Sequence, residues 1–387
     1  MKFESVAGHN NIKSRLTSFV KEQRLAHALL FLGPSGSGTL PLAVSFAGYI
    51  LCGNRTGDDA CGTCPSCKMT ERLSHPDLHF SFPIALKKNQ ETSDAWIQLF
   101  RESWLENPYM DYAGWMSHMD AENKQGVIGV EESTSIMKKL SLKSYSGGHK
   151  IQIIWLPEKM NHRAANQLLK ILEEPPEGTL FFLVAEEEEK ILQTILSRTQ
   201  LVKVPLLTDE ETATELVRLK GISMDEARGI SFLANGSFSY ALSLAGGFRP
   251  DESPHFLLFR DWMRICFKGD IFQIQKWVND MAAASRETQK TFLTYGLSII
   301  RESLMINYGD ISLVRLGGEE LDFLKKFAPY IHQNNCRKMI EELNLAINQM
   351  ERNANPKILF TGLSLQFMVY LKIPAQNPEN LSKFVTR

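Results

Sequence analysis

The sequence has no excess of charge of either sign. Its 387 residues include 43 basic and 44 acidic side chains, which gives a formal net charge of -1. A protein that binds nucleic acid through a broad surface usually carries many more basic than acidic residues. Contact with DNA would therefore have to be local or made through partners. With 43% hydrophobic and 22% charged residues, general disorder is also excluded.

Long apolar runs are missing as well. The first five residues lack the apolar stretch that is typical of a signal peptide, and the most apolar segment, residues 40–52, is too short and too broken to span a bilayer. We therefore expect a cytoplasmic protein without membrane contact. The length is sufficient for two or three domains of about 150 residues each.

Cysteine is scarce and unevenly distributed. Of the six cysteines, Cys266 and Cys336 lie alone in helical sequence, and the other four form one cluster: Cys52, Cys61, Cys64 and Cys67. This clustering indicates a metal site rather than a disulfide framework. We expect a structural zinc ion, because four thiolates suit a soft cation and leave no open coordination position. A redox pair or reduced thiols without metal are the alternatives.

The first 206 residues predict an α/β domain. Strands and helices alternate along the chain: helix 11–23, strand 27–32, a helix from about residue 40, helix 130–142, strand 151–155, helix 164–173 and strand 179–185. Alternation of this kind is typical of a mainly parallel sheet with helices on both faces. A polar segment, residues 87–124, contains Trp96, Trp104 and Trp115. We expect it to be an insertion with some amphipathic helix, whose role the sequence does not indicate.

Two further regions follow the α/β domain. Residues 207–247 predict a small helical domain, since Thr208 to Glu211 is a helix-start signal. Gly246, Gly247 and Pro250 mark a joint, and residues 248–387 predict an all-α domain with long amphipathic helices such as 256–267 and 334–350. Directly after the predicted strand 179–185, the acidic run Glu186 to Glu189 predicts the solvated first turn of a helix that ends near Ser197.

A glycine-rich turn follows the first strand. Residues 33–40, Gly-Pro-Ser-Gly-Ser-Gly-Thr-Leu, stand between a strand and a helix, as a phosphate-binding loop requires. A working loop places Lys on the phosphates and Ser or Thr on magnesium, but here Thr39 and Leu40 hold these positions. We therefore expect no ATP hydrolysis, and neither ATP nor magnesium, with Gly33, Gly36, Gly38 and Thr39 kept as a structural turn. The backbone amides of the turn are still able to cradle a phosphate, which is the alternative.

Two other positions bear on nucleotide chemistry. The end of strand 151–155 would carry a paired Asp-Glu in a nucleotide-hydrolysing fold, and only Glu158 stands nearby. Two independent losses, of the loop Lys and of the Asp-Glu pair, argue more strongly than one that such a site is inactive.

Arg198, with Ser197 and Thr199 beside it, lies near a predicted helix end, where a single Arg is usually a dipole partner or part of a surface ion pair.

Several of these motifs occur together in one known family. Four segments carry the similarity: residues 26–33, the cysteine cluster, residues 166–176 with the sequence Asn-Gln-Leu-Leu-Lys-Ile-Leu-Glu-Glu-Pro-Pro, and Ser197-Arg198-Thr199. In combination they resemble the AAA+ clamp-loader ATPase family of bacterial DNA polymerase III, over residues 3 to about 245. The resemblance implies an AAA+-type domain at 1–206 with a zinc module at 52–67, a lid domain at 207–247 and an all-α collar domain at 248–387.

The resemblance also implies roles. A motor subunit of this family keeps the loop Lys, the Asp-Glu pair and an Arg where this chain has Ser239. Their loss implies a non-catalytic member of the polymerase holoenzyme, in which Arg198, supported by Ser197 and Thr199, acts as an arginine finger on ATP held by a neighbour. The implied partners are the motor and clamp-opening subunits of a heteropentamer, the sliding clamp and primer-template DNA. An active motor with an atypical loop, or an unrelated zinc-stabilised nucleic-acid-binding protein, are the alternatives.

Overall fold

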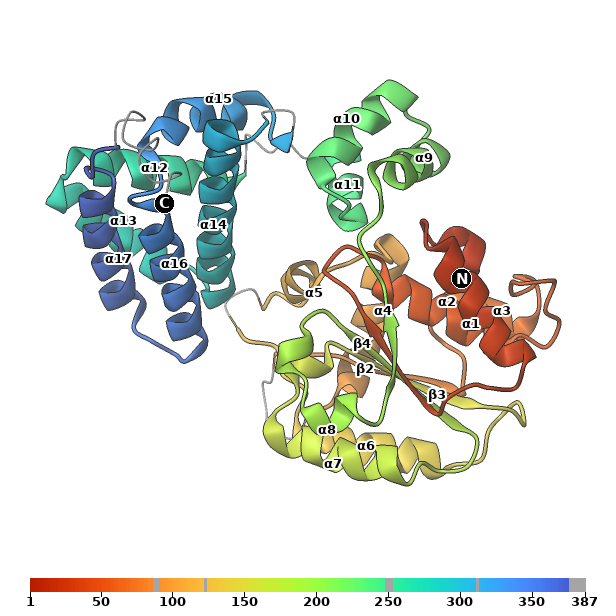
Figure 1. The fold of residues 1–387 in the computed structure, drawn as a ribbon. Helices are drawn as coiled ribbons and strands as arrows, with labels where there is room; N and C mark the ends of the chain where they lie inside the picture. The colour runs from red at the N-terminus through yellow and green to blue at the C-terminus, as the bar shows by residue number, and fades with distance from the viewer. Residues whose placement is uncertain (86–90, 122–123, 248–252, 311–312, 376–387) are drawn as a thin grey trace, which may run out of the picture. The chain divides into compact units, whose positions relative to one another are not determined.

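The computed structural model describes residues 1–85, 91–121, 124–247, 253–310 and 313–375 (Figure 1). The chain divides into two compact units, Met1–Gly246 and Gly247–Arg387. Among the described residues, no helix is both long enough and apolar enough to cross a membrane.

The first unit is built on a five-stranded parallel sheet. The strands are β1 (Ala28–Leu32), β2 (Leu78–Ser81), β3 (Lys150–Trp155), β4 (Thr179–Ala185) and β5 (Gln200–Lys203), and their spatial order is β2-β3-β4-β1-β5. Every neighbouring pair is parallel; Leu30, for example, lies opposite Leu183 on one side and Leu201 on the other. The predicted parallel sheet is confirmed. Because parallel strands end at the same edge, the turns after β1, β3 and β4 lie next to one another there.

Helices cover both faces of the sheet, as predicted (Figure 1). One face packs against α1 (Asn10–Lys21) and α2 (Thr39–Leu51), the other against α6 (Val130–Ser141), α7 (His162–Glu173) and α8 (Gln193–Leu196). Helix α3 (Pro65–Glu71) packs on α2. Alternate side chains of β1 point to opposite faces of the sheet and enter two different hydrophobic cores. Leu29 and Phe31 are in the core that contains Phe46 of α2, whereas Leu30 is in the core that contains Leu168 of α7. This alternation follows from the two-residue period of a strand.

The segment predicted to be an insertion is helical and forms part of the core. It contains a 3-10 turn, η2 (Ser93–Trp96), and two helices, α4 (Ile97–Glu106) and α5 (Tyr112–His118). The ring of Phe100 stacks on Phe82 at 4.0 Å between centroids and meets Trp115 edge-on at 5.2 Å. Trp115 is fully buried and its Nε1 donates a hydrogen bond to the carbonyl oxygen of Pro83, 2.7 Å away. Residues 87–90 and 122–123 of the predicted insertion lie outside the described residues.

The prediction of one helix from Glu187 to Ser197 is wrong. The chain forms a 3-10 turn, η4 (Glu188–Lys190), and then the separate four-residue helix α8. Ile191 and Leu192 between them have extended backbone, which allows Ile191 and Ile195 to be buried together behind the sheet. Glu186 is also not a solvated helical residue: it follows β4 directly and is partly buried, and desolvation raises the pKa of its carboxyl to about 7.

Three helices complete the first unit: α9 (Asp209–Lys220), α10 (Met224–Ala234) and α11 (Phe238–Ala245). Thr208 and Glu211 form a reciprocal capping box at the start of α9, as the sequence predicts, and the side chain of Ser237 caps α11. The three helices share a hydrophobic core that also includes Ala7 and Tyr109. The lid helices are therefore packed against residues from the beginning of the chain and from the insertion.

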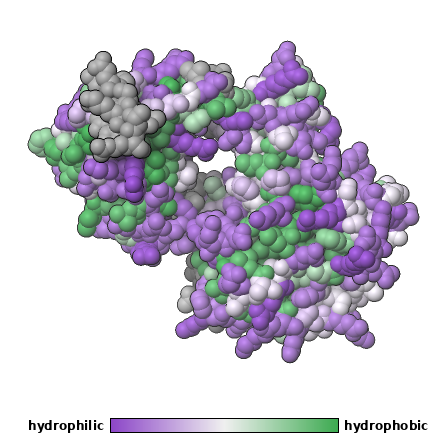
Figure 2. Space-filling view, viewed as in Figure 1, coloured by the Kyte–Doolittle hydropathy of each residue, from purple (hydrophilic) through white to green (hydrophobic). Residues whose placement is uncertain are grey.

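Among the described residues of the second unit, every regular element is a helix. It contains α12 (Pro254–Lys268), α13 (Ile271–Ala283), α14 (Arg286–Tyr308), α15 (Gly318–Phe327), η7 (Ala328–Tyr330), α16 (Cys336–Glu351) and α17 (Pro356–Tyr370). Aromatic rings pack against one another in its core; Trp262 stacks on Trp277 at 5.4 Å between centroids and packs against Phe367 at 4.7 Å. The predicted all-α region is confirmed. The face seen in Figure 2 carries both hydrophilic and hydrophobic side chains, and the exposed hydrophobic ones of this unit include Phe272 and Ile358.

Candidate functional site

The four clustered cysteines come together at one point of the first unit. Cys52 follows the last residue of α2, Cys61 lies in the connecting loop, and Cys64 and Cys67 stand at the start of α3. Their sulfur atoms all lie within 4.8 Å of one another, and none forms a disulfide. The sequence spacing thus gives one compact set of four sulfur donors.

The distances within this set fit a tetrahedral metal centre. The sulfurs of Cys52 and Cys61 are 3.6 Å apart, those of Cys61 and Cys67 3.8 Å, and those of Cys52 and Cys64 4.0 Å. Four sulfurs held about 2.3 Å from a zinc ion would lie about 3.8 Å from one another. Backbone N–H groups of Cys64 and Thr63 point at the Cys61 sulfur and lower the pKa of that thiol to about 6, whereas burial raises the pKa values of the Cys52 and Cys67 thiols. Metal binding at this cluster therefore has to release protons from the buried thiols.

The phosphate-loop sequence lies between β1 and α2. Gly36 and Gly38 have φ values of 81° and 85°, a left-handed conformation that favours glycine and explains two of the loop's glycines. Thr39 is the first residue of α2 and is buried, and Leu40 packs into the hydrophobic core with 3% of its surface exposed. The side chains at the two positions that would hold phosphate and magnesium are therefore uncharged and turned into the protein.

The lid lies directly on this loop. The backbone N–H of Phe238 donates a hydrogen bond to the carbonyl oxygen of Gly36, 2.8 Å away. A Cβ atom on Gly36 would lie only 2.0 Å from the Oγ of Ser237, so the loop and the first turn of α11 are in close contact. On the other side, the buried ring of His9 donates from Nε2 to the carbonyl oxygen of Ser37 at 2.7 Å.

Tyr109, from the loop between α4 and α5, closes the remaining space beside the loop. Its hydroxyl oxygen accepts a hydrogen bond from the backbone N–H of Ala7, 2.7 Å away, and its ring meets Phe238 edge-on at 4.8 Å. A Cβ atom on Gly38 would lie 3.2 Å from the Tyr109 ring. With 7% of its surface exposed, Tyr109 fills the volume between the loop, the start of the chain and the lid. No local sequence signal identifies this residue, because its contacts come from distant segments.

Two carboxyl groups lie at the ends of β3 and β4, beside the loop. Glu158, in the turn η3 (Pro157–Lys159), accepts a hydrogen bond at Oε1 from the backbone N–H of Glu186, 2.9 Å away. Its Oε2 is buried and has no hydrogen-bond partner among the described residues. Burial raises the pKa of both carboxyls, and the nearby Glu158 adds to the shift at Glu186.

An open groove runs past the same carboxyl groups. It has a volume of about 450 Å³, and its walls include Gly33 and Pro34 of the loop, three glutamates (Glu186, Glu188 and Glu189) and Lys203. With three carboxyl groups and one ammonium group, the groove is unfavourable for the negatively charged phosphates of a nucleotide.

Arg198 lies at the surface, after α8. Its Nη2 is 2.5 Å from Oε1 of Glu173, the last residue of α7, and its Nη1 donates to the carbonyl oxygen of Thr194 at 3.0 Å. The hydroxyl of Ser197 also donates to the Thr194 carbonyl, and the hydroxyl of Thr199 donates to that of Ile195. The two neighbours therefore bind the end of α8 and fix the backbone that carries Arg198. Among the described residues, Arg198 forms hydrogen bonds with Thr194 and Ser197 and an ion pair with Glu173, none of which belongs to the phosphate loop.

Comparisons with known proteins show which family this chain matches. A family model described as DNA polymerase III, delta subunit matches residues 8–208, which include the phosphate loop, the cysteine cluster and Arg198. The chain is 24% identical to DNA polymerase III subunit delta' of Bacillus subtilis (strain 168) over 364 residues, or 92% of this chain and 94% of that protein. It is 26% identical to DNA polymerase III subunit tau of the same organism over 279 residues, which cover 71% of this chain and 39% of tau.

A solved structure can also be aligned with this chain, at a low TM-score. The crystal structure of a DNA polymerase III, gamma subunit-related protein from Thermotoga maritima MSB8 aligns with 92% of this chain and 99% of its own, with a TM-score of 0.37 and 13% identity.

Proposed function

Because this chain belongs to the DNA polymerase III delta subunit family, a clamp-loader family, we propose that it is a non-catalytic subunit of the replicative clamp loader. In this role it does not turn over ATP itself. It assembles with motor subunits and a clamp-opening subunit, assists their ATP-driven loading of the sliding clamp onto primer-template DNA, and supplies Arg198 to the ATP of an adjacent motor subunit. A family member that kept its own ATPase would be the alternative.

The observation that carries this proposal is the state of the phosphate loop. A loop without the lysine lacks the cation that stabilises charge on the transferred phosphoryl group. Here Leu40 is in the core, Tyr109 fills the volume beside Gly38, and α11 contacts Gly36. A nucleotide bound beside Gly38 would compete for space with the Tyr109 ring, which the hydrogen bond from the Ala7 N–H holds in place. These contacts support a structural role for the loop.

The position of Arg198 supports a role toward another chain. Its side chain is 36% exposed and is held by one carboxylate, Glu173, which is itself 48% exposed. Exposed ion pairs of this kind contribute roughly 0–1 kcal/mol. A γ-phosphate on a neighbouring subunit carries more charge than a carboxylate and matches the fork of the guanidinium, so it can replace Glu173 as the partner of Arg198.

The cysteine cluster has a separate role in this proposal. Four thiolates would hold zinc as a closed structural site, and the ion would join the end of α2 to the start of α3. The chain's own residues then supply the geometry, since the sulfur atoms are already gathered around one point.

Reconstitution of the complex tests the proposed function. The motor subunits, clamp-opening subunit, clamp and primed DNA of the same species are combined with wild-type chain, with Arg198→Ala and with a control, Arg218→Ala. Arg218 is a matched control because it is another exposed arginine in an ion pair, with Glu215 three residues away. We expect the stimulated ATPase rate to fall at least tenfold for Arg198→Ala and to stay at the wild-type level for Arg218→Ala.

A second measurement separates the proposal from the alternative. The isolated chain is titrated with a fluorescent ATP analogue and magnesium. We expect no saturable binding up to about 1 mM. Tight magnesium-dependent binding would favour an active motor subunit, and an unchanged ATPase rate for Arg198→Ala in an intact complex would remove the arginine finger from the proposal.

A further inference from the structure

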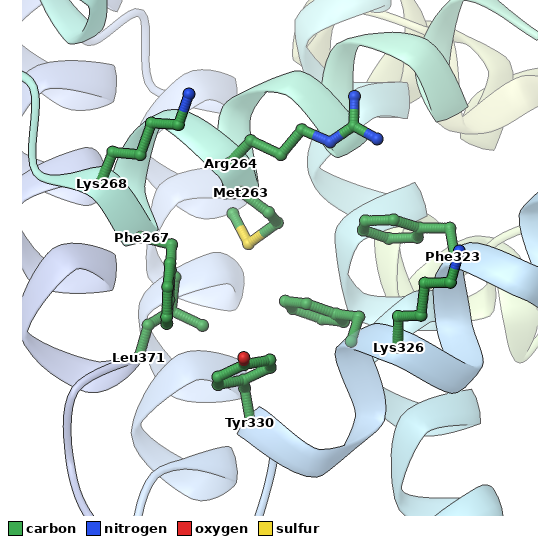
Figure 3. A pocket seen from close by; sticks show the side chains of 9 residues that line it. Met263, Arg264, Phe267, Lys268, Phe323, Lys326, Tyr330 and Leu371 are labelled. Carbon is green, nitrogen blue, oxygen red and sulfur yellow. The ribbon is translucent and has the colours of Figure 1, made fainter.

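The second unit contains a hollow that none of the features above uses. Its volume is about 250 Å³, and it lies between the C-terminal half of α12, the end of α15 with η7, and Leu371 after α17 (Figure 3). The side chains of Met263, Phe267, Phe327 and Tyr330 face it. The hollow is thus built from regular elements of the helical core.

The hollow is apolar and partly open. Its floor belongs to the core, since Met263, Phe327 and Leu371 are 2%, 6% and 4% exposed. Its wall is formed by two rings that remain in contact with solvent: Phe267 is 46% and Tyr330 42% exposed, and they meet edge-on at 5.0 Å between centroids. An exposed aromatic wall next to a buried apolar floor is typical of a surface that a partner side chain fills.

Three cationic side chains border the same hollow. Arg264 and Lys268 lie one turn apart on α12, and Lys326 lies on α15 (Figure 3). Arg264 has a neighbouring carboxylate, Asp261, 3.6 Å away. Lys268 and Lys326 form no ion pair within the part of the chain that the structure describes. In a chain with a net charge of -1, three cations around one apolar hollow form a distinct local feature.

We propose that this hollow is a docking site for an acidic peptide segment of a partner protein. One aromatic or large aliphatic side chain of the segment enters the hollow, and carboxylates on the flanking residues contact Arg264, Lys268 and Lys326. The charge complementarity sets the orientation and speeds association, while the apolar anchor provides the affinity. This inference depends on the second unit alone and stands whether or not the proposed function holds.

The size of the hollow favours a single side-chain anchor. Sites for small molecules and cofactors usually have about 300–1,000 Å³ and surround most of the ligand. A smaller, open hollow instead suits one ring or one branched side chain. The polar atoms around it are almost all cationic donors, so the ligand that satisfies them carries several acceptors, as a run of carboxylates does.

Nucleic acid fits this site less well. A base that entered the hollow would bury donors and acceptors on its edge, but the walls offer only the Tyr330 hydroxyl besides the cations. The rings are also engaged with one another, since Phe323 stacks on Phe327 at 5.4 Å and Phe267 contacts Tyr330. A second copy of this chain is unfavourable too, because a two-fold contact through this surface would oppose its three cations with the same three cations.

Fluorescence anisotropy with the full chain tests the proposal. The probe is a fluorescein-labelled peptide with one central Trp and four Asp on each side, compared with the same peptide carrying Ala in place of Trp. We expect saturable binding of the Trp peptide, at least tenfold weaker binding of the Ala peptide, and at least tenfold weaker binding after the double change Lys268→Glu and Lys326→Glu. Phe267→Ala should weaken binding about fivefold.

Two matched variants control for general effects. Lys357→Glu changes an exposed lysine on α17, and Phe272→Ala removes a ring on α13 that is 86% exposed. Neither residue borders the hollow, so we expect both affinities within about twofold of wild type. Circular dichroism of each variant checks that the fold is retained.

Several results would overturn the proposal. It fails if no saturable binding occurs up to about 1 mM peptide, if the Trp and Ala peptides bind equally, or if Lys357→Glu weakens binding as much as the double change. It also fails if oligo-dT displaces the labelled peptide at lower concentration than unlabelled peptide does. Sedimentation provides the last check: a dimer that Phe267→Ala dissociates would identify the surface as a contact between copies.

Discussion

Arg198 and Glu173 form an ion pair in which Nη2 of the guanidinium is 2.5 Å from Oε1 of the carboxylate. The two residues belong to different motifs, since Glu173 ends α7 and Arg198 follows α8. The pair therefore joins the Leu-Glu-Glu-Pro-Pro and Ser-Arg-Thr segments on the surface of the first unit. Because both side chains are partly exposed, the pair orients Arg198 without fixing it permanently.

Glu173→Gln should separate the carboxylate's role from that of the guanidinium. We expect the free energy of unfolding to change by no more than about 1 kcal/mol and the ATPase rate of the reconstituted complex to change less than about threefold. Arg198→Lys keeps the charge but loses the fork of donors, so its rate should fall clearly further. If Glu173→Gln lowered the rate as much as Arg198→Ala, the ion pair itself would be the functional unit.

Changes at Tyr109 should destabilise the first unit in two steps. Tyr109→Phe removes the acceptor of the Ala7 N–H and should cost about 1–3 kcal/mol, as expected for a buried donor without a partner. Tyr109→Ala also removes the ring from the core and should cost about 3–5 kcal/mol. Urea unfolding followed by circular dichroism measures both values. Tyr145→Phe is the control, since Tyr145 is 75% exposed, and a Tyr109→Phe variant as stable as wild type would show that the hydrogen bond contributes nothing.

Metal analysis checks the cysteine cluster. We expect one zinc ion per chain after purification without added metal, and its loss in Cys64→Ser, because three thiolates bind zinc much more weakly than four. Removal of the ion with a strong chelator should lower the melting temperature. Cys336→Ser changes a cysteine outside the cluster and should keep the ion. Purified protein that lacks any metal while remaining equally stable would point to the alternative of free thiols.

The pH dependence of stability should report on Glu186. Burial, with the neighbouring Glu158, raises the pKa of its carboxyl to about 7. Between its ordinary range and pH 7 the folded state then binds more protons at this site than the unfolded state, so the contribution of Glu186 to stability is present at low pH and is lost as the pH rises through 7. Glu186→Gln removes the charge and should make the protein more stable above pH 7, by about 1–3 kcal/mol. Equal pH profiles for the variant and wild type would contradict the raised pKa.

The sequence by itself determined the local elements and the compact motifs. The strand predicted at 179–185 is β4 residue for residue, and the helix predicted at 130–142 is α6 with one residue fewer. The cysteine cluster is also predictable from the sequence. Its four members are close in the chain, and the short loops between them bring the sulfur atoms together without contacts from distant segments. When the contacts that form a helix, a strand or a metal site lie within a few residues of sequence, intrinsic propensity and residue spacing are sufficient to predict it.

Only the tertiary structure decided what surrounds the candidate sites. The environment of Glu186, the break at Ile191 and Leu192, and the partner of Arg198 depend on elements that are distant in the sequence and packed together in the fold. The insertion shows the same limit most clearly: its helices were predicted, but not that Tyr109 would meet Ala7, Gly38 and Phe238. Local sequence sets backbone conformation, whereas the neighbours of a side chain are chosen by the packing of distant segments into one close-packed core.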